Sequence, residues 1–134
     1  MINLQQAYDE YKERVGDIDK ILYICLNEPN RNLVDSILSM SINELKNKTP
    51  LELNESAIIL SQYCIFLQNY ENKCKDFRRW IHKTLNFLSN DDKCRANNWL
   101  ISVDMRLQKL SYLCKRIDNM IQCLLNLSKT KQFS

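Results

Sequence analysis

Hydrophobic residues recur along this chain at alternating spacings of three and four, the pattern that places side chains on one side of an α-helix. The first such run is Leu4, Tyr8, Tyr11, Val15, Ile18, Leu22 and Cys25. It predicts an N-terminal helix that Pro29 ends, because proline cannot continue a helix. A second, shorter helix is predicted from about Asn32 to Lys46, with Asp35 complementing the positive end of its dipole. Its expected inner face is Val34, Ile37, Ser41 and Leu45.

The tetrapeptide Thr49-Pro50-Leu51-Glu52 is a helix start signal. Threonine suits the N-cap, proline suits the first helical position, and a glutamate three residues after the cap can reach back to it as a capping box. A long helix should follow, because apolar residues continue at heptad-like spacing. They are Leu60, Tyr63, Leu67, Tyr70, Cys74, Phe77 and Ile81, then Leu85 and Leu88.

The long apolar seam fails at Ser89-Asn90-Asp91-Asp92 and then resumes in a different register. Extending it by sevens from Leu88 reaches Arg95 and Ser102, which are polar. The resumed seam is Leu100, Val103, Leu107, Leu110, Cys114, Ile117, Ile121 and Leu124. The simplest explanation is a reversal that folds two long helices into an antiparallel hairpin, although an uninterrupted helix with a skip would also reset the register.

The sequence therefore predicts an all-α protein, a long coiled-coil-like antiparallel hairpin with N-terminal helices. The 134 residues include only one glycine and two prolines. This supports an all-α fold, because a sheet needs many turns and turns favour these residues. We assign residues 1–134 to a single domain, with acidic N-terminal helices over 1–48 and a basic hairpin over 49–134. Several large apolar residues lie beside the seams and favour a homo-oligomer, unless the shorter helices cover them within one subunit. They are Ile58, Ile59, Ile65, Phe66, Trp80, Phe87, Trp99, Ile101, Leu113 and Leu125.

Six cysteines are present without a C-x-x-C motif or a close Cys/His pair. We interpret all of them as free thiols in a reducing compartment, because metal sites are normally built from such local pairs. No apolar run approaches the roughly 20 residues of a membrane span, and the first residues lack the pattern of a signal peptide. We expect an intracellular, cytoplasmic protein without a membrane partner.

Charge is divided unevenly along the chain. Residues 1–70 hold six Lys or Arg against ten Asp or Glu, a net charge of −4, whereas residues 71–134 hold thirteen against six, a net charge of +7. The segment KCKDFRRWIHKTL, residues 73–85, combines the apolar seam with a basic face. The candidate nucleic-acid-binding residues of this face are Lys73, Lys75, Arg78, Arg79, Trp80, His82 and Lys83.

Cations neutralise phosphates and an aromatic ring can stack on an unpaired base, so single-stranded nucleic acid matches this basic face. An acidic protein surface would also fit. A plain solvated face, with Trp80 packed against a neighbouring helix, is the alternative without function. The only histidine is His82, and the sequence has no Gly-rich phosphate loop, no paired metal ligands and no nucleophile beside a base. We predict no enzymatic activity, no catalytic residue, no metal site and no cofactor.

The order of these elements resembles the UvsY-type recombination mediators of tailed phages over roughly residues 50–131. The likeness consists of a helix start at 51–55, Tyr63-Cys64-Ile65-Phe66-Leu67 as a Y-x-x-aromatic-L element, the basic helix at 73–83, and a final helix containing residues 116–122, RIDNMIQ. Members of that family are small helical proteins that assemble into rings, bind single-stranded DNA and help load a RecA-like recombinase onto strands coated by single-stranded-DNA-binding protein. The resemblance implies phosphate contacts by Lys73, Lys75, Arg78, Arg79 and Lys83, and assembly through the last helix.

We therefore expect a single-stranded DNA-binding recombination mediator, acting in the host cytoplasm if it is phage-encoded. Its partners would be single-stranded DNA, a recombinase or a single-stranded-DNA-binding protein, and further copies of itself. The alternative is a non-enzymatic coiled-coil interaction or assembly protein, such as a phage structural adaptor or a host-factor inhibitor, that binds an acidic protein partner.

Overall fold

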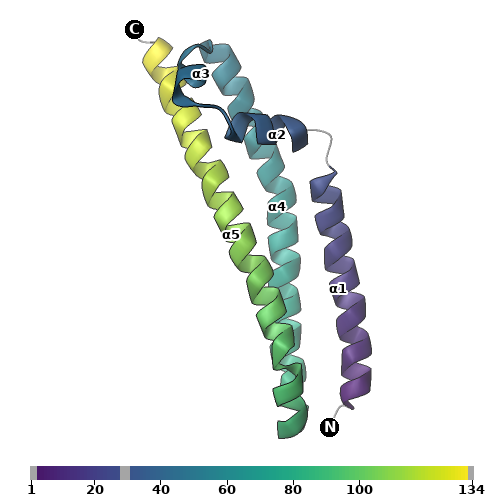
Figure 1. The fold of residues 1–134 in the computed structure, drawn as a ribbon. Coiled ribbons are helices and arrows are strands. Elements are labelled where there is room, and N and C mark those ends of the chain that lie inside the picture. The colour runs from purple at the N-terminus through teal and green to yellow at the C-terminus, as the bar shows by residue number, and fades with distance from the viewer. Residues whose placement is uncertain (1–2, 28–30, 133–134) are drawn as a thin grey trace. The chain divides into compact units, whose positions relative to one another are not determined.

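The computed structural model describes residues 3–27 and 31–132, and its regular structure there is entirely α-helical (Figure 1). The helices are α1 (Leu4–Leu26), α2 (Arg31–Leu38), α3 (Ile42–Lys46), α4 (Pro50–Leu85) and α5 (Asn90–Gln132). The all-α prediction is confirmed. Pro29, expected to end the first helix, lies outside the described residues, as does the side chain of Cys25.

The segment predicted as one helix over residues 32–46 forms two helices, so that prediction is wrong. Between α2 and α3, the Ser41 side chain accepts a hydrogen bond from the backbone N–H of Glu44 (3.2 Å) and makes Ser41 the N-cap of α3. Ser41 is therefore exposed, whereas Val34, Ile37 and Leu45 are buried as predicted. The sequence Ser-Ile-Asn-Glu has the pattern of a capping box, as Thr-Pro-Leu-Glu at the start of α4 does. It therefore signals the start of α3, which the prediction of one helix does not include.

The predicted capping box at the start of α4 is confirmed. The backbone N–H of Glu52 donates to Thr49 Oγ1 (3.1 Å), and the backbone N–H of Thr49 donates to Glu52 Oε1 (3.2 Å). Hydrogen bonds from the backbone N–H and the side chain of Thr49 to the Glu52 carboxylate lower the pKa of that carboxyl. The start of α5 is capped in a related way, because Ser89 Oγ accepts from the backbone N–H of Asp92 (3.2 Å). The interruption between Leu85 and Asn90 accounts for the change of register between the two seams.

Replacing Thr49 with alanine should lower the free energy of unfolding by about 1 kcal/mol, the usual cost of losing an N-cap hydroxyl. Thr49→Ser keeps the acceptor and should stay within about 0.5 kcal/mol of the natural chain. Urea denaturation followed by circular dichroism measures both. Equal stabilities for the alanine and serine variants would contradict the capping role.

The chain forms two compact units, each built from segments far apart in sequence. The described residues of unit 1 are 3–24 and 68–110, so it contains most of α1, the second half of α4 and the first half of α5. The described residues of unit 2 are 25–27, 31–67 and 111–132, so it contains α2, α3 and the remaining halves of α4 and α5. The single-domain assignment of residues 1–134 stays a prediction.

Most of the apolar seam positions are buried within these units. Residues of α4 at intervals of seven are at most 2% exposed; they are Leu53, Leu60, Leu67, Cys74 and Ile81. On α5 a corresponding line is at most 5% exposed; its members are Ala96, Val103, Leu110, Ile117 and Leu124. The stripe predicted on α1 is less covered, because Ile18 is buried while Tyr8 is 41% exposed. The heptad spacing therefore marks the packing side of α4 and α5 correctly.

In unit 1 the two halves of α4 and α5 run in opposite directions on either side of the turn at 86–89 (Figure 1). Helix α1 lies beside them and runs with α5, since Tyr11 stacks on Trp99 (4.7 Å between ring centroids) and Asp19 pairs with Arg106 (3.6 Å). Phe77 links α4 to α1 through Tyr11 (5.6 Å). Three helices thus share one core in this unit.

In unit 2 the halves of α4 and α5 again lie side by side, and α2 crosses α4 (Figure 1). The Arg31 guanidinium hydrogen-bonds the Tyr63 hydroxyl and contacts its ring (5.5 Å to the centroid). Lys131 Nζ of α5 donates to the carbonyl oxygens of Lys46, the last residue of α3, and of Lys48, which follows α3. These contacts join α2 to α4, and the end of α3 to α5. None of the helices in the described ranges is long and apolar enough to cross a membrane.

Candidate nucleic-acid interface

The predicted basic face lies on the part of α4 that belongs to unit 1. Its polar members are exposed; they are Lys73, Lys75, Arg78, Arg79, His82 and Lys83. The neighbouring seam residues Cys74, Phe77 and Ile81 are at most 2% exposed. These polar side chains point toward solvent because they lie at helix positions outside the buried apolar seam.

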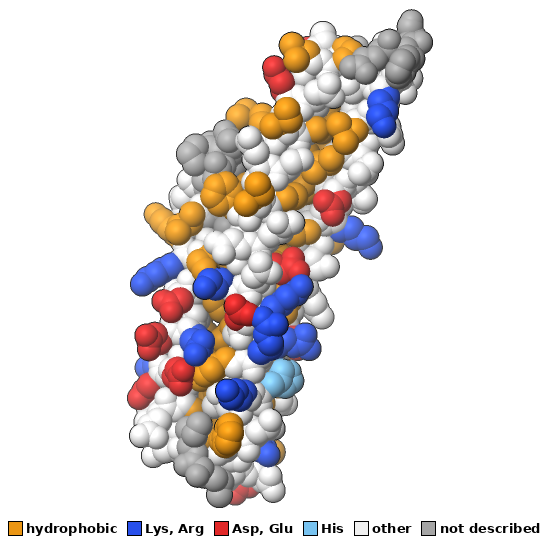
Figure 2. Space-filling model, turned by 180° about the vertical axis from the view of Figure 1, so that it is seen from behind, with side chains coloured by type: hydrophobic (Ala, Val, Ile, Leu, Met, Phe, Trp, Pro, Cys, Tyr) orange, Lys and Arg blue, Asp and Glu red, His pale blue; other side chains and the backbone are white. Residues whose placement is uncertain are grey.

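Three of the five Lys and Arg side chains of this face already contact carboxylates of the same chain. Lys75 Nζ pairs with Glu71 (2.6 Å), Arg78 Nε pairs with Asp104 of α5 (3.3 Å), and Arg79 pairs with Asp76. In the described part of the chain, no ion pair includes Lys73 or Lys83. Figure 2 shows this mixture of charges: Lys and Arg side chains lie beside the histidine, and Asp and Glu side chains lie among them.

Trp80 is half-buried and belongs to an aromatic cluster made of Tyr8, Tyr11, Phe77, Trp80 and Trp99. Its ring stacks on Phe77 (6.0 Å) and on Trp99 (6.4 Å). The Arg14 guanidinium of α1 lies over the same ring, 4.8 Å from its centroid. A nucleic-acid base could reach this face of Trp80 only by displacing Arg14, so the phosphate contacts form the stronger part of the candidate interface.

The acidic N-terminal helix packs in the same unit as the basic half of α4. The described residues of unit 1 contain twelve Lys or Arg and ten Asp or Glu, a net charge of +2. The charge division seen along the sequence is therefore not preserved within this unit. Asp19 of α1 pairs with Arg106 of α5, which shows one such compensation directly. The basic face is a local feature of α4 and does not extend over the whole unit.

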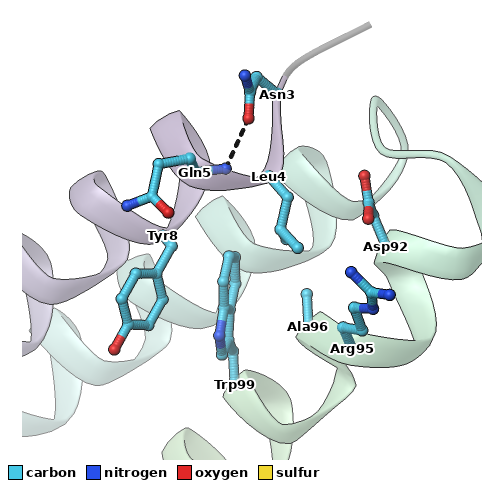
Figure 3. Close-up of a pocket in the computed structure, with 8 residues that line it drawn as sticks. All are labelled: Asn3, Leu4, Gln5, Tyr8, Asp92, Arg95, Ala96 and Trp99. Carbon is cyan, nitrogen blue, oxygen red and sulfur yellow. Dashed lines mark hydrogen bonds between the residues drawn. The ribbon is translucent and has the colours of Figure 1, made fainter.

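Unit 1 also carries an open hollow of about 790 Å³ where the first turns of α1 and α5 meet (Figure 3). Its lining is Asn3, Leu4, Gln5, Tyr8, Asp92, Arg95, Ala96 and Trp99. Figure 3 shows Tyr8 and Trp99 on one side of the hollow and Asp92 and Arg95 on the other. The opposite charges of Asp92 and Arg95 leave the hollow without a preference for anions or cations.

The cysteines described in the structure are free thiols. Burial raises the pKa of the Cys64 thiol to about 11, with smaller contributions from the nearby Asp118 and Cys114. Burial also raises the pKa of Cys74 and of Tyr70, whose side chains hydrogen-bond each other. The Cys64 and Cys74 thiols therefore stay protonated near neutral pH, which makes them poor nucleophiles. Within residues 3–27 and 31–132, no three His, Cys, Asp or Glu side chains are grouped as metal ligands.

Several apolar residues that lie beside the predicted seams are exposed in the structure. Those at least 37% exposed are Ile58, Ile65, Phe66, Phe87, Ile101 and Leu125. Ile59, Trp80 and Leu113 are intermediate, and Trp99 is only 7% exposed because it sits inside the aromatic cluster. Helix α1 contacts Trp80 and Trp99, whereas a substantial group of these residues stays uncovered.

Sequence reasoning missed the contacts that surround the basic face. The Glu71–Lys75 and Asp76–Arg79 pairs have spacings of four and three, so helical periodicity could have revealed them. Arg14 over Trp80 and Asp104 beside Arg78 join different helices, and no spacing within one helix signals them. Comparison of the chain with protein-family models, curated proteins and solved structures finds no match.

Proposed function

We propose that the protein is a non-catalytic binding protein that holds single-stranded DNA on the basic face of α4. The observation that supports this proposal best is the exposure of every Lys and Arg between residues 73 and 83, beside the buried seam residues Cys74, Phe77 and Ile81. These eleven positions span about 15 Å of helix. A flexible strand can follow such a short, narrow face through its phosphates.

The ion pairs on this face do not oppose DNA binding strongly. The side chains of Arg78 and Asp104 are 49% and 44% exposed, and those of Arg79 and Asp76 are 75% and 58% exposed. Exposed pairs of this kind contribute about 0–1 kcal/mol each. Phosphates can therefore replace the carboxylates, with the release of condensed counterions from the DNA favouring the exchange.

The biological role that we propose is that of an accessory protein in recombination, as the resemblance of residues 50–131 implies. In this role the chain would help load a RecA-like recombinase onto strands covered by single-stranded-DNA-binding protein, in the cytoplasm. We further propose that residues 49–134 act as a coiled-coil-like hairpin and that several identical chains assemble. The exposed apolar residues support assembly, because apolar patches on a monomer are usually small.

A salt titration tests DNA binding. We expect the chain to bind a fluorescein-labelled thirty-nucleotide oligothymidylate at low salt, with an affinity that falls steeply as salt rises. Replacing Arg78, Arg79 and Lys83 with alanine should weaken binding roughly tenfold or more and reduce the log–log salt slope by about 2, because about 0.7 counterions are released per phosphate contact. Fluorescence anisotropy measures both quantities.

The matched control replaces three exposed cations of unit 2, Lys46, Lys115 and Arg116, with alanine. It removes the same amount of charge from another surface and should keep most of the affinity. Equal losses in the two triple variants would show that net charge, and not the basic face, determines binding. Absence of binding by the natural chain at low salt would exclude the proposal.

A second candidate function is binding to an acidic protein as an interaction or assembly protein. It is favoured by the contacts of Lys75, Arg78 and Arg79 with carboxylates, which show that this face accommodates carboxylate groups. A partner's Asp and Glu side chains could take the same positions. This candidate predicts no affinity for the oligonucleotide at low salt, so the titration separates the two functions.

A further inference from the structure

Two cysteines of unit 2 lie on neighbouring helices. Cys64 is on α4 and Cys114 is on α5, and each is partly exposed. The halves of these two helices lie side by side in this unit (Figure 1). Whether the two sulfur atoms can meet depends on the register of the helices, that is, on which residue of α4 lies beside which residue of α5.

Two contacts near the ends of α4 and α5 give this register. Ser128 Oγ of α5 donates to the carbonyl oxygen of Pro50, the first residue of α4 (3.5 Å). Lys131 Nζ, one turn further along α5, donates to the carbonyl oxygen of Lys48, which precedes α4. Later residues of α5 therefore lie beside earlier residues of the chain around α4, so the two helices are antiparallel here, with Pro50 and Ser128 at the same level.

Cys64 and Cys114 are reached from this contact by equal steps. Cys64 follows Pro50 by fourteen residues, and Cys114 precedes Ser128 by fourteen residues. Each step corresponds to about 21 Å along its helix and to about four turns. Because the helices are antiparallel, both steps lead to the same level and return to the same side of each helix. The register therefore places Cys64 opposite Cys114.

The electrostatics of Cys64 give the same placement independently. Burial is the largest cause of the raised pKa of its thiol, and Asp118 and Cys114 contribute to the rise. Neighbouring charges shift a pKa in this way when they lie within about 4–6 Å. Asp118 follows Cys114 by one helical turn, so both groups come from one side of α5. Register and electrostatics thus agree that the two cysteines are neighbours.

We propose that Cys64 and Cys114 form a reversible disulfide bond, which joins α4 to α5, when the chain meets a small-molecule disulfide such as oxidised glutathione. The reaction is thiol–disulfide exchange. The thiolate of one cysteine attacks the small disulfide, forms a mixed disulfide and releases one small thiol. The thiolate of the other cysteine attacks the protein sulfur of that mixed disulfide and releases the second small thiol. The two cysteines lose two electrons and two protons, which the small disulfide takes up as it becomes two thiols.

The bond links segments of unit 2 that are far apart in the sequence. It closes a covalent loop that contains all of residues 68–110. A disulfide stabilises a fold mainly by restricting the unfolded chain, and the effect grows with the length of the loop. Oxidation should therefore make the contact between α4 and α5 in unit 2 more resistant to unfolding, and reduction should reverse this. The proposal goes beyond the proposed DNA binding and does not depend on it.

Peptide mapping after oxidation tests the pairing. The purified chain is incubated with excess oxidised glutathione in mildly alkaline buffer, because the Cys64 thiol is protonated near neutral pH, and is then alkylated and digested with trypsin without reductant. Cleavage after Lys and Arg places Cys64 in peptide 49–73 and Cys114 in peptide 110–115, each without another cysteine. We expect these two peptides to be joined until a reductant is added. The exposed Cys94 shows in the same digest that the oxidant has reacted with the chain.

Serine variants define the pair. Cys64→Ser and Cys114→Ser should each abolish the joined peptides and the rise of the urea midpoint on oxidation. Cys123→Ser is the matched control and should leave both unchanged, because Cys123 is also a partly exposed residue of α5 in unit 2. The proposal would be overturned if Cys94 carried glutathione while peptides 49–73 and 110–115 stayed separate. It would also be overturned if Cys64 were joined to another cysteine, or to Cys114 only between two chains, which a non-reducing gel detects.

Discussion

Replacing Trp99 with alanine is expected to lower the free energy of unfolding by about 3–5 kcal/mol, the range for removing a large buried aromatic side chain. Trp99 is 7% exposed and stacks on Tyr11 at 4.7 Å with nearly parallel rings, 9° apart. It also contacts Trp80 and Tyr8 (6.4 Å each), so its loss leaves a cavity where α1, α4 and α5 meet. Urea denaturation followed by far-UV circular dichroism measures the loss.

Tyr112→Ala is the control for the Trp99 variant. Tyr112 is on the same helix but is 68% exposed, so its removal should change stability by no more than about 0.5 kcal/mol. If the Trp99 variant lost less than about 1 kcal/mol of unfolding free energy, this would contradict the conclusion that the aromatic cluster stabilises unit 1.

Leu124→Ala should cost about 2–5 kcal/mol of stability, because Leu124 is 0% exposed and its truncation leaves a cavity in unit 2. The adjacent Leu125 is 37% exposed, so Leu125→Ala should cost about 1 kcal/mol. The two variants remove the same atoms from neighbouring positions of one helix. The difference in their denaturation midpoints therefore reports burial alone, provided that the two m-values agree.

Equal costs for Leu124→Ala and Leu125→Ala would indicate that α5 is rotated from the orientation described. One residue corresponds to about 100° around a helix, so neighbouring residues of α5 face different surroundings and should differ in cost. Measurement at low protein concentration keeps association of chains from contributing to either value.

The helices and their buried sides could be predicted because periodicity and capping are local properties of the sequence. Leu53, Leu60 and Leu67 follow the heptad spacing, and Thr49 with Glu52 forms the predicted capping box. The break before α3 was predictable in principle, since Ser41 and Glu44 carry the same signature. It was missed because an apolar spacing that continues through residues 34–45 outweighed the cap.

The candidate site could be predicted only as a set of exposed cations on one helix. Which acids neutralise them depends on how α1 and α5 are rotated and placed beside α4, and periodicity within a single helix does not contain that information. Asp104 reaches Arg78 from α5, and Arg14 reaches Trp80 from α1. The acidic residues of α1 were counted correctly in the sequence, but their packing in the same unit as the basic helix could not be foreseen.

The discontinuous make-up of the two units has a consequence for the order of folding. The segment at 68–110 is contiguous in sequence, and its two helical parts are joined by the short link at 86–89, so they meet at a small loop-closure cost. Unit 2 joins residues 31–67 to residues 111–132, which are separated in sequence by that entire segment. Contacts between segments that are distant in sequence form late, because the chain loses loop-closure entropy before the contacts contribute any favourable free energy. Association of the two helical parts of residues 68–110 shortens the effective separation of the segments on either side of it, so we expect this segment to nucleate the fold, before residues 3–24 join it and unit 2 forms.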